Sequence, residues 1–217
     1  MKKILTVAGC IILVILIAIG CIAYVNRSNI ASLITAFKYD KAQISDQIKK
    51  TNDNLKDNLQ QYFEEDIRDF TDEENEAIKK GEMSESEALA KAIIEAPKKS
   101  SQSADAIIAK YTSQLLTLES KYIGLIEDVL GSAVAEYHAL PIDQLGYGSK
   151  MRIMQKHVGT INSLEATCDG EVEAIISKLT EELNAIGADT SIINTIRQAY
   201  NNEKSLKKAY YISEYGD

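Results

Sequence analysis

The first stretch of the sequence is apolar and carries no charge. After two lysines come 22 residues, 4–25, without a charged side chain. As a helix, this run is long enough to cross roughly 30 Å of hydrocarbon. It also exceeds the apolar core of a usual signal peptide, about 7 to 15 residues. We therefore predict a membrane anchor over residues 1–27.

The orientation of this anchor follows from its flanks. A short basic N-terminus ahead of a first apolar helix favours insertion with the N-terminus in the cytoplasm and the body outside. Two alternatives stay open. Gly20 before Cys21 is similar to a permissive bacterial lipoprotein signal, in which Cys21 would be lipidated, and the run could also be a conventional signal that is cleaved. All three alternatives place the body outside the cytoplasm.

Apolar residues recur every eleven positions between residues 29 and 70. The two series are Phe37, Ile48, Leu59 and Phe70, and Leu33, Ile44 and Leu55. Eleven residues fill about three helical turns, so each series stays on one face of a nearly straight helix. The pattern predicts one long helix that continues from the anchor, because no proline or glycine separates them.

Two short helices are predicted next, each with its own start and stop signals. Thr71 and Gly81 bound a helix over residues 72–80. A capping box opens a second helix at Ser84, which runs to Ala96. The proline and polar residues that follow form the clearest loop of the chain, so the pair is predicted to be a helical hairpin.

The strongest periodicity lies between residues 104 and 138, where apolar residues repeat every seven positions. The first seam position holds Ile108, Leu115, Tyr122 and Val129, and the second holds Tyr111, Leu118 and Leu125. A heptad pattern of this kind needs a partner helix. A second long helix over residues 149–186 offers one, and the short connection around Pro141 makes the two helices antiparallel neighbours.

The partner face of the second long helix and a third helix complete the predicted bundle. The partner face carries Met154, Val158, Ile161, Cys168, Val172, Ile175, Leu179 and Ile186. Thr190 is expected to cap the third helix, whose seam residues are Ile193, Ile196, Tyr200, Leu206 or Lys207, and Tyr210. The predicted fold is all-α, an N-terminal transmembrane helix followed by an elongated antiparallel helical coiled-coil bundle. Its segments are 1–27 (anchor), 28–97 (membrane-proximal helix and short hairpin) and 98–217 (antiparallel three-helix coiled coil).

Charge and cysteine content narrow the function classes. The formal net charge of −8 repels phosphate backbones, so we expect no nucleic-acid partner. Of the three cysteines, Cys10 and Cys21 lie in the apolar run, which leaves Cys168 alone in the body. A lone cysteine forms neither an intramolecular disulfide nor a CxxC pair, and we interpret it as a small apolar residue of a helix seam.

Candidate chemistry is sparse. His138 and His157 could approach across the predicted turn, with Glu136 and Asp143 nearby, as ligands for a transition metal. We expect solvent-exposed or helix-capping histidines instead, because their spacing has no signature. An acidic run comprises Glu64, Glu65, Asp66, Asp69, Asp72, Glu73 and Glu74. It lacks the alternating ligands of an EF-hand and is typical of a solvated helix face.

The tyrosines and the absence of motifs complete the search for a site. Tyr39, Tyr62, Tyr111, Tyr122, Tyr137, Tyr147, Tyr200, Tyr210, Tyr211 and Tyr215 could form an aromatic belt or a carbohydrate platform. Several occupy seam positions, so we expect core packing with the hydroxyl reaching solvent. No GxSxG, HExxH or phosphate-binding loop occurs in the sequence. We therefore assign no catalytic, cofactor-binding or metal-binding residues and no cofactor.

The C-terminal part of the chain resembles a known group of proteins. The segments that carry the resemblance are 139–141 (ALP), 164–169 (LEATCD) and 203–211 (EKSLKKAYY). They resemble uncharacterised membrane-anchored helical proteins of Gram-positive anaerobic bacteria. The resemblance implies a bacterial source and a cell-envelope context, and no activity or site residues.

These observations favour a non-enzymatic, membrane-anchored extracytoplasmic coiled-coil protein. It would act as a scaffold, spacer or protein-interaction module of the cell envelope, bound to the membrane through residues 4–25. Protein partners would bind through helix faces, and self-association into a homo-oligomer stays open. An extracytoplasmic ligand-sensing bundle that acts through a partner is the alternative.

Overall fold

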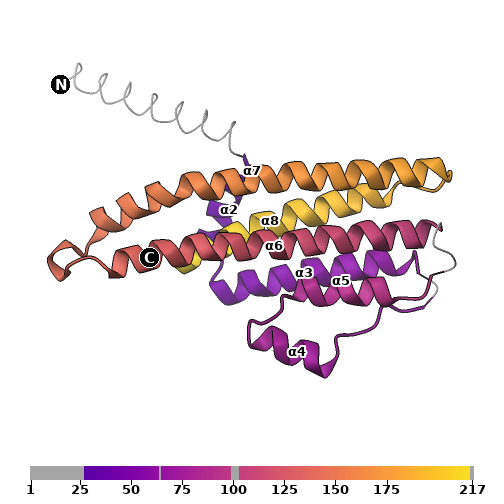
Figure 1. Cartoon of the computed structure of the whole chain (residues 1–217), viewed down its shortest axis with the longest axis horizontal. Coiled ribbons are helices and arrows are strands. Elements are labelled where there is room, and N and C mark those ends of the chain that lie inside the picture. The colour runs from indigo at the N-terminus through magenta and orange to yellow at the C-terminus, as the bar shows by residue number, and fades with distance from the viewer. Residues whose placement is uncertain (1–26, 64, 99–102, 216–217) are drawn as a thin grey trace, which may run out of the picture. The chain divides into compact units, whose positions relative to one another are not determined.

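The computed structural model describes residues 27–63, 65–98 and 103–215. Every regular element in these residues is a helix, which confirms the all-α prediction (Figure 1). None of the described helices is both long enough and apolar enough to cross a membrane. The predicted anchor, residues 4–25, lies outside the described residues.

The chain divides into two compact units. The first comprises residues 1–55 together with 195–217, and the second comprises residues 56–194. Helices α3 and α8 each contribute residues to both units. The three segments expected from the sequence, with boundaries after residues 27 and 97, stay a prediction.

In the first unit, the single helix predicted over residues 29–70 is replaced by α2 (Arg27–Lys38) and α3 (Lys41–Gln60). The break falls at Asp40, whose Oδ1 accepts a hydrogen bond from the backbone N of Gln43 at 2.8 Å. Gln43 Oε1 in turn accepts one from the backbone N of Asp40 at 3.0 Å. This reciprocal pair is a capping box that starts a new helix. The prediction of one continuous helix was therefore wrong.

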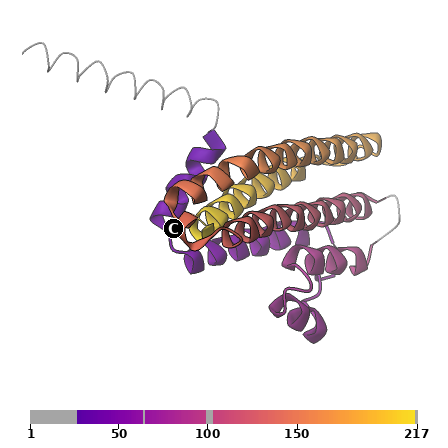
Figure 2. The same ribbon diagram turned by 60° about the vertical axis from the view of Figure 1, so that its left-hand side comes forward.

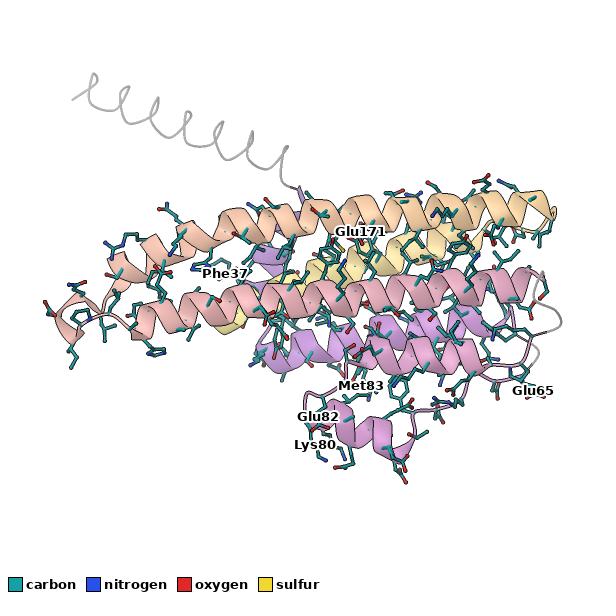
Figure 3. The ribbon with its side chains drawn as sticks, viewed as in Figure 1. Phe37, Glu65, Lys80, Glu82, Met83 and Glu171 are labelled. Carbon is teal, nitrogen blue, oxygen red and sulfur yellow. The ribbon has the colours of Figure 1, made fainter. Side chains whose placement is uncertain are left out.

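The first unit also contains α8 (Ile192–Tyr215) from Thr195 onward. Its buried residues include Ile44, Leu55, Ile196 and Ala209. A contact between Ser32 Oγ on α2 and Ser205 Oγ on α8, 3.2 Å apart, joins two of its helices. Phe37, by contrast, is 84% exposed, although it belongs to the predicted apolar stripe (Figure 3).

The second unit begins with the two short helices, α4 (Asp72–Lys79) and α5 (Glu85–Glu95). The side-chain oxygens of Thr71 and Ser84 each accept a backbone hydrogen bond from the glutamate three residues later, and both capping boxes are complete. Gly81 follows α4 with φ +72°, a left-handed conformation that favours glycine. Both predicted short helices are confirmed.

Arg68 ties the segment before α4 to both short helices. Its guanidinium donates to the two carboxylate oxygens of Glu74 at 2.7 and 2.9 Å, and its Nε donates to Glu95 at 2.6 Å. Such a bidentate pair fixes geometry as well as adding charge attraction. The hydrogen bonds from Arg68 are the main reason that the pKa of Glu74 falls to about 2.

A long helical hairpin forms the rest of the second unit. It consists of α6 (Ala104–His138), the short 3₁₀ helix η1 (Ile142–Gln144) and α7 (Tyr147–Ala185). Figures 1 and 2 show α6 and α7 converging on the connection at η1, with α5 along the first half of α6. The predicted pair of long antiparallel helices is therefore confirmed.

The turn after α7 differs in one detail from the prediction. Gly187 has φ +66°, and the backbone N of Ala188 donates back to Leu183 O at 3.0 Å, which ends the helix as expected. The capping side chain ahead of α8 is Asp189, whose Oδ1 accepts from the backbone N of Ser191 at 3.0 Å. Asp189 thus takes the role predicted for Thr190.

Candidate functional site

In the described residues, α6 and α7 are joined by three polar contacts of one kind, here termed polar clamps. In each clamp, a lysine and the aromatic residue after it approach one glutamate on the other helix. The first clamp joins Lys110 and Tyr111 of α6 to Glu182 of α7: the lysine Nζ lies 2.9 Å from Oε1, and the tyrosine hydroxyl donates to the same oxygen at 2.5 Å. The hydrogen bond from Tyr111, which has the larger effect, and that from Lys110 hold the pKa of Glu182 below its ordinary value.

The second clamp repeats this arrangement further along the hairpin. The hydroxyl of Tyr122 donates to Glu171 Oε1 at 2.8 Å, and Lys121 Nζ lies 3.6 Å from Glu171 Oε2. Figure 3 labels Glu171. Ionisation of Tyr122 would place a phenolate beside a carboxylate. The hydrogen bond to Glu171, helped by burial, therefore raises the pKa of Tyr122 to about 12.

The third clamp has the opposite polarity. Its glutamate, Glu136, is on α6, and its donors are on α7: Lys156 Nζ lies 2.8 Å from Glu136 Oε2, and His157 Nε2 lies 3.1 Å from the same oxygen. The hydrogen bond with Lys156, which has the larger effect, and that with His157 lower the pKa of Glu136. This clamp lies closest to the connection between the helices.

The spacing of the clamps gives the register of the hairpin. Eleven residues forward on α6, from Tyr111 to Tyr122, correspond to eleven residues back on α7, from Glu182 to Glu171. Fourteen further residues on α6 reach Glu136, and fourteen residues back on α7 reach its partner in the third clamp. Eleven and fourteen residues are close to three and four helical turns, so all three clamps lie along one side of the pair.

Burial along α6 stops beyond Tyr122, whereas Ile153 on α7 is only 5% exposed. The first half of α6 has buried residues at the predicted seam, including Leu118 at 8% exposure, whereas no described residue of α6 after Tyr122 is buried. Leu125, also predicted to lie in the seam, is 37% exposed and is therefore not fully packed. Residues 123–160 are termed the arm. Its exposed large apolar residues are Leu125, Val134, Ile142, Leu145 and Val158.

The contact with α5 ends close to the point where the burial of α6 stops. Ser84, which caps α5, donates its hydroxyl to Ser120 of α6 at 3.1 Å, and Ser86 donates to Glu119 at 3.0 Å. From this contact α5 runs back toward the start of α6 (Figure 1). Within the second unit, α5 therefore covers α6 up to about Ser120, and the arm extends beyond that cover.

The two histidines considered as metal ligands, and expected instead to be solvent-exposed or helix-capping, make other contacts. His157 belongs to the third clamp, and the ring of His138 packs edge-on against Tyr137, with 5.9 Å between the ring centroids. Asp143 is an exposed residue of η1. Among the residues that the structure describes, no group of three His, Cys, Asp or Glu side chains could hold a metal ion.

The acidic run is divided between ion pairs and exposed positions. Asp69 lies 2.8 Å from Lys56, and Glu74 binds Arg68. Glu65 and Asp66 are exposed, and Glu64 lies outside the described residues. Asp69 and Glu74 thus brace the segment around α4.

At two positions, the tyrosine prediction is correct for core packing and wrong for the hydroxyl. Tyr111 and Tyr122 are 4% and 6% exposed, yet their hydroxyls bind glutamates instead of reaching solvent. Cys168 is a buried residue of α7, as expected for a seam position. The acceptors Glu171 and Glu182 were missed, although their spacing matches that of the two Lys-Tyr pairs and could have revealed them.

Comparisons with known proteins identify no relative for this arrangement. No family model matches the chain, and neither a curated protein nor a solved structure matches it. The resemblance carried by residues 139–217 therefore stays an expectation.

Proposed function

We propose that the chain is a membrane-anchored extracytoplasmic protein that acts, without catalysis, as a scaffold, spacer or protein-interaction module of the cell envelope. The observation that carries the proposal is the arm, a helical hairpin that exposes large apolar residues from both helices and from their connection. Apolar surface gathered on one segment suits contact with another protein through helix faces. The uncharged run over residues 4–25 supports attachment to the membrane.

Coiled-coil packing between α6 and α7 is part of this proposal. It is supported by the burial of Ile108, Tyr111, Leu118 and Tyr122, which all occupy predicted heptad positions. The polar clamps resemble the interhelical ion pairs that flank a coiled-coil seam and set its orientation. A hairpin fixed in this way could present the arm as a defined surface.

The proposal is tested by capturing partners in the membrane. The full chain, tagged at its C-terminus, is crosslinked in bacterial cells and solubilised, and the crosslinked proteins are identified by mass spectrometry. The arm variant Val134→Asn with Val158→Asn is compared with Ile94→Asn, which alters an apolar residue of α5 that is 50% exposed. We expect crosslinks that the arm variant loses and the control keeps. Crosslinks that are absent, or equal in all three proteins, would contradict an interaction role for the arm.

A further inference from the structure

The two helices of the arm carry opposite charge. The α6 part, residues 123–138, contains Glu127, Asp128 and Glu136 and no lysine or arginine. The α7 part, residues 147–160, contains Lys150, Arg152 and Lys156 and no acidic residue. This separation occurs in a chain whose formal net charge is −8. The arm is therefore an acidic helix beside a basic helix.

We propose that the arms of two copies of this chain pack against each other around a two-fold axis, so that α6 of each copy lies along α7 of the other. A two-fold interface brings the same patch of both copies together, so the patch must be complementary to itself. An acidic helix beside a basic helix meets this condition, because each acidic helix then faces a basic one. The charge pattern thus selects a second copy as the occupant.

The apolar residues of the arm provide the area that such a contact would cover. Leu125 and Val134 on α6 and Val158 on α7 are 37%, 38% and 48% exposed. The sixteen residues of the α6 part span about 24 Å. Two hairpins packed along this length form a four-helix bundle, in which half-exposed residues of a lone hairpin become core.

The clamp inside the arm leaves other charges to meet the second copy. Glu136 binds Lys156 and His157 within its own hairpin, which holds the two helices together. Asp128 and Arg152 are exposed and lie on opposite helices of the arm. Paired across the axis, such charges set the orientation of the two copies more than they raise affinity.

This inference rests on the proposed interaction function and names its partner. The decisive experiment exchanges charges on the full chain, purified in detergent, with association measured by analytical ultracentrifugation over a concentration series. One variant carries Glu127→Lys and Asp128→Lys, and the other carries Lys150→Glu and Arg152→Glu. Each variant alone brings like charges together in the dimer, whereas a mixture of the two restores opposite charges.

We expect the wild-type chain to dimerise. The dissociation constant of the dimer should be at least about tenfold higher for each variant alone. An equimolar mixture of the variants should recover the dimer. Lys79→Glu with Lys80→Glu, a charge reversal at the end of α4, should leave dimerisation unchanged, and circular dichroism should show that every variant is helical. A monomeric wild-type chain, dimers indifferent to the arm charges, or no recovery on mixing would each overturn the proposal. A monomer that still forms arm-dependent crosslinks to another protein would overturn self-association alone and leave the interaction function standing.

Discussion

Tyr122 on α6 and Glu171 on α7 are joined by a hydrogen bond of 2.8 Å at the point where the buried part of α6 ends. Before Tyr122, α6 is covered by α5 and α7 within the second unit. Beyond Tyr122, the hairpin continues as the exposed arm. The pair therefore joins the two helices where the burial of α6 ends, and the third clamp joins them again within the arm.

Removal of the Tyr122 hydroxyl is expected to destabilise the second unit. Tyr122→Phe keeps the ring and leaves Glu171 without its nearest donor, so the melting temperature should fall, by less than for deletion of a buried leucine side chain. Glu171→Gln should also lower it. In a double-mutant cycle, the double variant should lose less stability than the sum of the losses in the two single variants. Strictly additive effects would mean that the hydrogen bond contributes no coupling.

Two leucines of the predicted seam should respond differently to truncation. Leu118 is 8% exposed, so Leu118→Ala should cost about 2 to 5 kcal/mol of unfolding free energy. Leu125 is 37% exposed, and Leu125→Ala should cost less than about 1 kcal/mol. Chemical denaturation of the monomeric chain measures both values. Equal losses would show that burial along α6 is not divided at Tyr122.

A buried hydroxyl in α6 offers a stabilising substitution. Thr112 is 1% exposed and its Oγ1 has no hydrogen-bond partner, so Thr112→Val should raise the unfolding free energy by about 1 kcal/mol. Thr117 is the matched control, since its exposed hydroxyl donates to Ser113 O at 2.9 Å. Thr117→Val should give no gain. Destabilisation by Thr112→Val would indicate that its hydroxyl is satisfied.

The Arg68 cluster predicts a loss of stability in acid. The pKa of Glu74 is lowered from 4.5 to about 2 by the hydrogen bonds from Arg68, so its contribution is present above pH 4.5. That contribution should be lost as pH falls from 4.5 toward 2, because the unfolded chain then binds a proton that the folded carboxylate does not. Thermal unfolding of wild type and Glu74→Gln should differ at pH 6 and converge in acid. A constant difference across this range would contradict the shift.

The proposed topology has its own test. Protease added to intact cells stripped of wall should degrade the body, because the anchor is predicted to place it outside the membrane. A cytoplasmic marker protein should survive the same treatment. If the body is lost only after lysis, the orientation is reversed.

The sequence predicts the elements whose signals are local. Heptad spacing located α6 at its observed bounds, and the capping residues Thr71 and Ser84 located the short helices. The break at Asp40 also has a local signal, the capping pair with Gln43, but the apolar spacing continues across it. The spacing of apolar residues indicates which face of a helix is buried. It does not show where polar side chains end one helix and start the next.

Features that depend on other elements were beyond the sequence pattern. Leu125 occupies a heptad position as regular as that of Leu118, yet Leu118 is 8% exposed and lies before the Ser84–Ser120 contact with α5, whereas Leu125 is 37% exposed and lies beyond it. From the sequence alone, the glutamates of the clamps are indistinguishable from solvated surface residues. Their partners follow only from the register of the hairpin. Burial and pairing of this kind depend on which other helices lie nearby. The spacing of apolar residues along one helix does not give that information.

The clamps also bear on alternative alignments of the hairpin. A heptad seam by itself tolerates a slip of seven residues, because apolar positions meet apolar positions again. Such a slip would place Ile175 and Leu164, seven positions before Glu182 and Glu171, opposite Tyr111 and Tyr122. Two buried hydroxyls would then face aliphatic side chains, and both carboxylates would lose their tyrosine donors. The misaligned hairpin is thereby disfavoured, and a mostly repetitive pair of helices keeps one alignment.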